Sequence, residues 1–235
     1  MSPYAFLASH DPRIRGRPRG FTLAELLVAL TMVFLFAVVL ATTVSGVMAH
    51  VHKTACVSNI RGQLIGLLAY CADHGKRYYW PAANSWDDRA PVLLYPDYVS
   101  SLEIFICPAT KNRIRQDVID AKTGKPVDLN NNAADGRDAR GGHSYEYFGY
   151  YRIPPNQMRL EWIGDKFHAR KRPGHPYRSE HQTVLILDGD DSGINNFPAE
   201  ENNHGAAGWH WGFADGHVRW ISTRETLREF ARSGQ

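Results

Sequence analysis

The longest hydrophobic stretch of the chain lies close to its N-terminus. Residues 26–49 are 24 consecutive positions without Asp, Glu, Lys or Arg. At about 1.5 Å per residue, a helix of this length extends for roughly 36 Å, which is enough to cross the core of a bilayer. A secretory signal has a shorter apolar region of about 7–15 residues. The pattern predicts a transmembrane helix, with cleavage after the small residues of Val47-Met48-Ala49 as the alternative.

Beyond this span, apolar residues continue at the spacing of an amphipathic helix. They are Val57, Ile60, Leu64, Leu67, Leu68 and Cys71. The pattern ends at Asp73-His74-Gly75, where glycine suits a helix C-cap. We expect one stalk helix within residues 21–75, with its outer half packed on the rest of the chain. Gly62 and Gly66 lie on one side of it, where they either permit close approach of another element or are merely tolerated.

Residues 76–235 form the only plausible globular head, and 160 residues are enough to bury a core. We expect strands at residues 102–107 and 183–187, a hairpin at 209–220, and a last helix opened by the capping box Ser222-Thr-Arg-Glu225. Residues 108–142 are polar, and we expect them to be mobile. Strands that follow one long helix indicate an α+β fold, a stalk helix packed on a small antiparallel sheet.

The hairpin carries a turn signal at its centre. Asp215-Gly216 is typical of a two-residue type I′ turn, because both residues accept positive φ. That turn pairs Phe213 with Val218 and Trp211 with Trp220, and it places these four side chains on one face. It also separates His210 from His217 by roughly 13 Å, too far to share one zinc ion. A metal site that combines His204 with one of the two stays open.

The basic excess of the chain is confined to its first 20 residues. The formal charge is +3, but Arg13, Arg15, Arg17 and Arg19 face only Asp11, and the remaining 215 residues carry 23 basic and 23 acidic side chains. A nucleic-acid-binding body is therefore disfavoured, because phosphate binding needs clustered Lys and Arg. The positive-inside rule places the N-terminus in the cytoplasm and the head outside.

Glu25 is unusual because it lies just inside the apolar run. An ionised carboxylate costs about 2.5–3.5 kcal/mol at mid-membrane and less near the interface, so it needs a partner or must reach the headgroups. The surrounding residues, Arg19-Gly20-Phe21-Thr22-Leu23-Ala24-Glu25, resemble the processing site of type IV prepilins and type II secretion pseudopilins. In that family a basic leader ends in Gly, and the mature chain starts with Phe and has Glu as its fifth residue.

This resemblance implies a processing and assembly pathway. Prepilin peptidase would cut between Gly20 and Phe21, removing residues 1–20 as a leader, and the new amine of Phe21 would be methylated. Glu25 would pair with the N-terminal amine of a neighbouring subunit in a pseudopilus or type IV pilus-like filament. The implied location is the bacterial inner membrane with a periplasmic head, and the implied partners are other pilin subunits and the assembly platform.

A second resemblance covers most of the chain. Cys56, Cys107, His204 and Asp215-Gly216 with their neighbours are similar to pseudopilin-like proteins named for a C-terminal His-x9-Asp-Gly region, although ten residues separate His204 from Asp215 here. Cys56 and Cys71 are roughly 22 Å apart on one helix, so Cys107 either pairs with one of them outside the cytoplasm or all three stay free thiols. The resemblance favours a Cys56–Cys107 disulfide.

Candidate chemistry is otherwise sparse. Asp188, Asp190 and Asp191 place three carboxylates in four positions, which suits either a calcium site, as some pseudopilins have, or a solvated turn. No nucleophile elbow, His-Glu-x-x-His or phosphate loop occurs, so we expect no enzyme. Two classes remain: a pseudopilin-like structural subunit, or a monomeric membrane-anchored periplasmic binding protein. Glu25 discriminates between them, since polymerisation would explain a carboxylate at that depth.

Overall fold

A computed structural model describes residues 20–75, 79–80, 89–131, 141–152, 168–171, 173–174, 178–189 and 203–233, except for the side chains of 42–45, 151–152 and 168–170. The chain divides into two compact units, Met1–Gly46 and Val47–Gln235. Helix α1 (Leu23–Asp73) contributes residues to both.

In the first unit, α1 exposes apolar side chains on all sides. Phe21 is 88% exposed, and Leu26, Val33 and Phe36 are among the many exposed residues that follow. The helix is long and apolar enough to cross a membrane, with a mean hydropathy of 2.7 in its most apolar window and none of that window buried. This agrees with the expected transmembrane segment as far as length and composition go.

In the second unit, the remainder of α1 forms one wall of the core. The predicted stripe is buried at Ile60, Leu64, Leu67 and Cys71, and the helix ends at Asp73 as expected. Gly75 follows with a φ of +71°, and His74 N–H donates to the Tyr70 carbonyl at 3.1 Å. These contacts confirm the predicted helix end.

The two stalk glycines permit close packing. A Cβ added at Gly66 would lie 2.8 Å from Val99 Cγ2, and one added at Gly62 would overlap Ile104. Of the two readings left open by the sequence, close approach of another element is therefore correct. The approaching segment lies between helix α2 (Ala90–Leu94) and Cys107.

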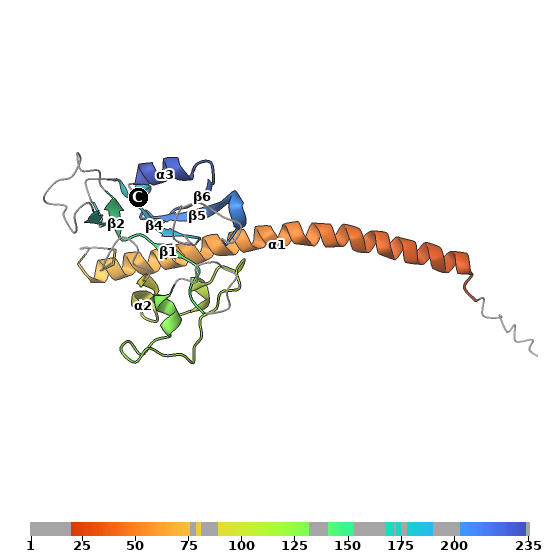
Figure 1. The fold of residues 1–235 in the computed structure, drawn as a ribbon, viewed down its shortest axis with the longest axis horizontal. Coiled ribbons are helices and arrows are strands. Elements are labelled where there is room, and N and C mark those ends of the chain that lie inside the picture. The colour runs from red at the N-terminus through yellow and green to blue at the C-terminus, as the bar shows by residue number, and fades with distance from the viewer. Residues whose placement is uncertain are drawn as a thin grey trace, which may run out of the picture. The chain divides into compact units, whose positions relative to one another are not determined.

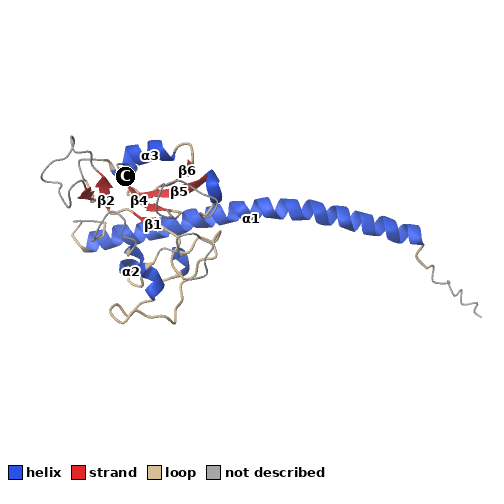
Figure 2. Ribbon diagram, viewed as in Figure 1, coloured by secondary structure: helices blue, strands red, loops and turns tan. Residues whose placement is uncertain are grey.

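A four-stranded antiparallel sheet forms the centre of the head, in the order β1-β4-β5-β6 (Figure 2). The strands are β1 (Glu146–Tyr147), β4 (Val184–Leu187), β5 (Gly208–Phe213) and β6 (Val218–Ser222). Strands β2 (Tyr150–Arg152) and β3 (His168–Arg170) form a separate two-stranded sheet. The predicted strand at 183–187, the hairpin and the α+β class are confirmed.

Both faces of the four-stranded sheet are covered (Figure 1). On one face Trp209, Trp211 and Ile221 pack with Phe230 of helix α3 (Thr226–Ser233). On the other face the sheet meets α1, and a Cβ added at Gly212 would lie 2.5 Å from Ile60 Cγ2. Helix α2 packs on α1 within the same core, through Ala90 and Leu94. The layers are thus α3, sheet, α1 and the α2 segment.

The hairpin register differs from the predicted one. Trp211 pairs with Arg219 and Gly212 with Val218, because Ala214, Asp215 and Gly216 together form a three-residue loop. Gly216 N–H donates to the Phe213 carbonyl at 2.9 Å, His217 O accepts from Phe213 N–H at 3.0 Å, and Gly216 has φ +88°. This is a type I turn followed by a glycine bulge, so the type I′ turn is wrong. Trp211 and Trp220 consequently lie on opposite faces.

Residues 102–107 do not form the predicted strand. Glu103–Phe105 is a 3-10 turn, η1. Side chains of α1 bind its carbonyls instead of a neighbouring strand: Gln63 Nε2 donates to Ile104 O at 2.7 Å and Asn59 Nδ2 to Ile106 O at 2.9 Å. An apolar run that docks on a helix can satisfy its backbone in this way without a ladder.

The described part of the 108–142 excursion packs on the head, contrary to expectation. It contains a second 3-10 turn, η2 (Val127–Asn130), in which Asp128 and Leu129 are buried. Further 3-10 turns, η5 (Glu180–Gln182) and η6 (Gly205–Ala207), precede β4 and β5. The capping contact before α3 is present, with Ser222 Oγ donating to Glu225 Oε2 at 2.7 Å, although α3 itself begins at Thr226.

Candidate functional site

The start of α1 is a capping box. Thr22 N–H and Thr22 Oγ1 both donate to Glu25 Oε2 at 2.8 Å, and Glu25 N–H donates to Thr22 Oγ1 at 3.2 Å. Thr22 is thus the N-cap and Glu25 the third helical residue, which satisfies amide groups that the helix would otherwise leave unpaired. The sequence contains the Thr-x-x-Glu signal of a capping box. The cost of an ionised Glu25 in the membrane, on which the sequence analysis relied, does not reveal this role.

The predicted processing bond lies immediately before this cap. Gly20 and Phe21 are both exposed and precede the first helical residue, Leu23. No atom lies within 4 Å of a Cβ added at Gly20. Among the described residues, no hydrogen bond joins the Gly20–Phe21 peptide group to α1, which begins at Leu23.

A buried polar group occupies the second unit where α1 meets the sheet. We call Cys56, Asp188, His204 and His210 the Asp188 cluster. Cys56 comes from α1, Asp188 directly follows β4, His204 precedes η6, and His210 lies in β5. Asp188 N–H donates to the His210 carbonyl at 2.9 Å, so the β4–β5 ladder continues one residue beyond β4 and fixes the carboxylate beside the histidine.

Both carboxylate oxygens of Asp188 are engaged. Oδ2 lies 2.7 Å from His204 Nε2 and 3.1 Å from His210 Nδ1. Oδ1 accepts from the Asn203 amide, whose nitrogen also donates to the Ser144 carbonyl at 2.7 Å. The Asp188 side chain is fully buried, and those of His204 and His210 are 3% and 6% exposed.

Two of the three cysteines meet at the same place. Cys56 Sγ lies 3.0 Å from Cys107 Sγ and 3.2 Å from the Tyr145 hydroxyl, and Cys107 Sγ lies 3.7 Å from His204 Nε2. None of the three cysteines forms a disulfide, and all three are buried. Of the two partners that the sequence offered to Cys107, the structure places Cys56 beside it.

The electrostatics of the cluster follow from its burial and pairing. Burial disfavours the charged forms, but hydrogen bonds from His204 and His210 outweigh it and hold the pKa of Asp188 well below its ordinary value. Burial likewise opposes protonation of His204, yet its bond to Asp188 raises its pKa to about 10. Burial and the neighbouring Cys107 raise the pKa of Cys56. Without a bound cation, the cluster is thus a His204–Asp188 ion pair beside a neutral Cys56 thiol.

This geometry is not that of a cysteine–histidine–aspartate relay. A relay needs the thiol and the carboxylate on opposite ring nitrogens of the histidine. Here Cys107 and Asp188 both approach Nε2 of His204. The four ligand atoms of the Asp188 cluster instead lie within 4.8 Å of one another, an arrangement able to hold a metal ion.

A second group of this kind lies at the hairpin turn. Asp215 Oδ2 lies 3.0 Å from His181 Nδ1, and Asp215 Oδ1 lies 2.5 Å from His217 Nδ1. His181 is 75% exposed, and His217 stacks on Phe213 with ring centres 4.2 Å apart. Asp215 and Gly216, predicted as a structural turn, therefore also orient two surface histidines.

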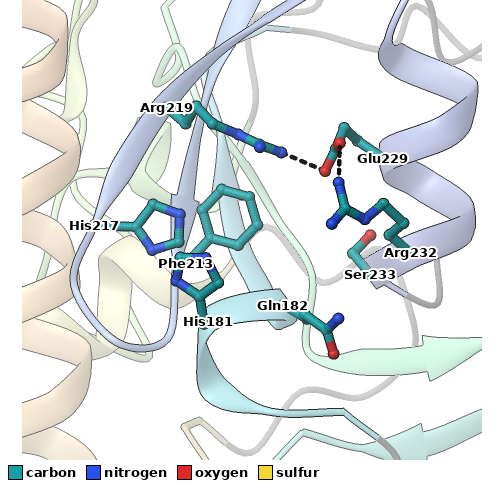
Figure 3. A pocket seen from close by; sticks show the side chains of 8 residues that line it. All are labelled: His181, Gln182, Phe213, His217, Arg219, Glu229, Arg232 and Ser233. Carbon is teal, nitrogen blue, oxygen red and sulfur yellow. Dashed lines mark hydrogen bonds and ion pairs between the residues drawn. The ribbon is translucent and has the colours of Figure 1, made fainter.

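The small pocket in Figure 3 adjoins this turn. His181, His217 and Phe213 line one side, while Arg219 and Arg232 reach Glu229 from different elements on the other. Its volume of about 30 Å³ holds roughly two water molecules. Its size therefore suits solvent rather than an organic ligand.

From the sequence, Asp188, Asp190 and Asp191 suited either a calcium site or a solvated turn. The last two lie outside the described residues, and Asp188 faces imidazole and thiol groups, whereas Ca²⁺ prefers oxygen ligands. His210 and His217 fall in different clusters, in agreement with the prediction that they cannot share one ion. His204, for which a partner was left open, joins His210.

Comparisons with known proteins gave no match: none among protein-family models, none among curated proteins and none among solved structures.

Proposed function

We propose that the chain is a pseudopilin-like structural subunit of a type II secretion pseudopilus or type IV pilus-like filament. The observation that carries the proposal is the N-terminal segment, in which an exposed Gly20–Phe21 bond directly precedes a capped, apolar helix. In this proposal prepilin peptidase removes residues 1–20 at the inner membrane. The head then lies in the periplasm, and other subunits and the assembly platform are its partners.

The capping box is compatible with this processing. It uses the N–H and hydroxyl of Thr22, so cleavage before Phe21 leaves it intact and places the new amine one residue before the N-cap. Only Oε2 of Glu25 is engaged, and among the described residues nothing hydrogen-bonds Oε1. One carboxylate can thus cap its own helix and still accept a charged amine from a neighbouring subunit.

In this proposal the role of the head is mechanical. Ile60, Leu64 and Leu67 of α1 are fully buried in its core, so within this unit a force along the helix acts on the whole fold. The buried Cys107–His204–Asp188 contacts lack the arrangement of a relay. The alternative is a monomeric membrane-anchored binding protein, which needs neither cleavage at Gly20 nor a partner for Glu25.

Mass spectrometry of the mature N-terminus tests the proposal. Protein isolated from membranes that contain prepilin peptidase should be a 215-residue chain starting at Phe21, heavier by one methyl group. Gly20→Val should leave the full 235 residues, whereas the matched variant Gly16→Val in the same leader should still be processed. An intact N-terminus, or one at His50, would overturn the proposal.

A further inference from the structure

The Asp188 cluster unites four metal-binding side chains from three parts of the fold. One comes from α1, one from the end of β4, and two from the segment that leads through η6 into β5. Their side chains are buried: Cys56 and Asp188 are fully buried, and the side chains of His204 and His210 are 3% and 6% exposed. Buried ionisable groups require partners, and here those groups are also the classical ligands of a transition metal.

We propose that Cys56, Asp188, His204 and His210 bind one Zn²⁺ ion, which fastens α1 to the sheet. The proposal does not depend on polymerisation of the chain. Four ligands at zinc bond lengths of about 2.0–2.3 Å lie roughly 3.3–3.8 Å apart in a tetrahedron. The Asp188 oxygen is 2.7 Å and 3.1 Å from the two histidine nitrogens, and all four ligand atoms lie within 4.8 Å. Adjustments of about 1 Å or less would complete the coordination.

The donor set favours zinc over calcium. Two imidazole nitrogens, one carboxylate oxygen and one sulfur form a mixed, partly soft set, whereas calcium takes six to eight oxygens. The charges also balance. The thiolate and the carboxylate supply two negative charges and the two neutral imidazoles none, so a bound Zn²⁺ leaves the buried site neutral. Binding requires the thiolate form of Cys56 and the neutral form of both imidazoles, so zinc affinity should fall as the pH is lowered.

Neighbouring groups already orient the ligands. Asn203 holds Asp188 Oδ1 and leaves Oδ2 for the ion, and the Tyr145 hydroxyl lies 3.2 Å from Cys56 Sγ. Hydrogen bonds of this kind to metal ligands are what fixes them in established sites. Cys107 lies beside Cys56, so a disulfide between the two would remove the thiolate that the ion requires. The site is therefore expected only in protein with reduced cysteines.

Metal analysis of the full-length protein, purified in detergent with a thiol-free reductant, tests this site. We expect about one equivalent of zinc by elemental mass spectrometry. In protein stripped by a chelator and titrated with Co²⁺, we expect the visible spectrum of tetrahedral cobalt and a thiolate-to-cobalt charge-transfer band. His204→Ala and His210→Ala should each weaken Co²⁺ binding more than tenfold. The matched variant His217→Ala, in the exposed cluster, should bind cobalt like the parent protein.

A second pair of variants identifies the sulfur ligand and does not depend on the histidine variants folding. Cys56→Ser should abolish the charge-transfer band, whereas Cys107→Ser should keep it, because Cys107 lies beside the cluster. Zinc content well below one equivalent with no tetrahedral cobalt spectrum would overturn the proposal. So would a cobalt spectrum that depends on His217, or a charge-transfer band that survives Cys56→Ser.

Discussion

Asp128 and Asp188 are the two aspartates buried among the described residues of the head, and each is held by more than one donor. Asp188 meets two histidines and an asparagine. Asp128 accepts from Arg115 Nη2 at 2.7 Å, from Arg115 Nε at 3.0 Å, and from the Arg115 N–H at 2.7 Å. A buried carboxylate without such partners would cost several kcal/mol, so these residues fix the segments that supply the donors.

Asp128 should stabilise the packed segment at residues 113–128. Burial raises the pKa of Asp128, but the bonds and charge of Arg115 outweigh it and lower the pKa below its ordinary value. Its contribution is therefore complete above the unfolded pKa of about 3.9, and it is lost as the pH falls through the lower, folded value. Arg115 is 38% exposed, so solvent screening limits what the ion pair contributes to stability. We therefore expect Asp128→Asn to lower the free energy of unfolding by about 1–3 kcal/mol at neutral pH.

Thermal unfolding of the full chain at pH 7 and in acid measures this effect. Asp117→Asn makes the same chemical change at an exposed position of the same segment and should change stability by less than about 0.5 kcal/mol. The difference between the two variants should shrink at low pH. Equal unfolding temperatures for both variants at pH 7 would contradict the assigned role of Asp128.

At the scale of elements, the sheet is covered on both faces, and this explains the error in the predicted register. Alternation of apolar and polar residues identifies the buried face of a sheet when the other face meets water. Here Trp211 packs on α3, while the opposite face, with Gly212, packs on α1. A one-residue shift therefore exchanges one buried face for the other, and the apolar pattern does not select between them.

The hairpin turn gives a prediction at this scale. Gly216 has a φ of +88° in open space, so substitutions there are opposed by backbone strain and not by contacts. We expect Gly216→Val to destabilise the head by about 1–3 kcal/mol, and Gly216→Asn, which tolerates positive φ, to cost less. His217→Ala should change the unfolding free energy by less than about 0.5 kcal/mol. Thermal unfolding checks the order of the three, and a Gly216→Val protein as stable as the parent would refute the assigned turn.

The spacing of apolar and polar residues correctly predicted the elements that depend on residues close together in the chain. The stalk helix to Asp73, the strand at 183–187, the hairpin and the Ser222–Glu225 contact all rest on residues close in the chain. The Asp188 cluster does not, because Cys56 and His210 are joined only by the docking of α1 on the sheet. The failed strand at 102–107 has the same origin, since Gln63 of α1 takes a carbonyl that a strand would have bonded.

At the scale of the whole molecule, the parts of α1 in the two units differ in burial. Residues such as Leu30 and Phe34 are 60% and 69% exposed, whereas Ile60 and Leu64 are fully buried in the head. An exposed apolar surface of this extent is typical of segments that lipid or other helices cover. Membrane insertion and helix packing in a filament both provide this cover, and Glu25 is the residue at which the two can be told apart.

Glu25 has two candidate roles, and substitutions can separate them. Gln retains the capping-box hydrogen bonds but loses the charge, whereas Ala loses both. If the charge pairs with a neighbouring amine, Glu25→Gln and Glu25→Ala should both insert in the membrane and be cleaved after Gly20 but form no filaments. Thr22→Ala weakens the cap and keeps the charge, so it should still assemble. Membrane fractionation and electron microscopy of sheared filaments measure these outcomes.

The two roles predict different filament yields for the parent protein and the three variants. Filament yields in the order parent, Thr22→Ala, and then none for Glu25→Gln would assign the carboxylate to subunit pairing. Normal filaments from Glu25→Gln, together with their loss in both Thr22→Ala and Glu25→Ala, would assign it to the cap alone. The second outcome would leave the subunits without a charged register, and filament assembly would then rest on packing of the apolar helices alone. The membrane-anchored monomer becomes the better account of the chain if the parent protein, correctly inserted in the membrane, forms no filaments.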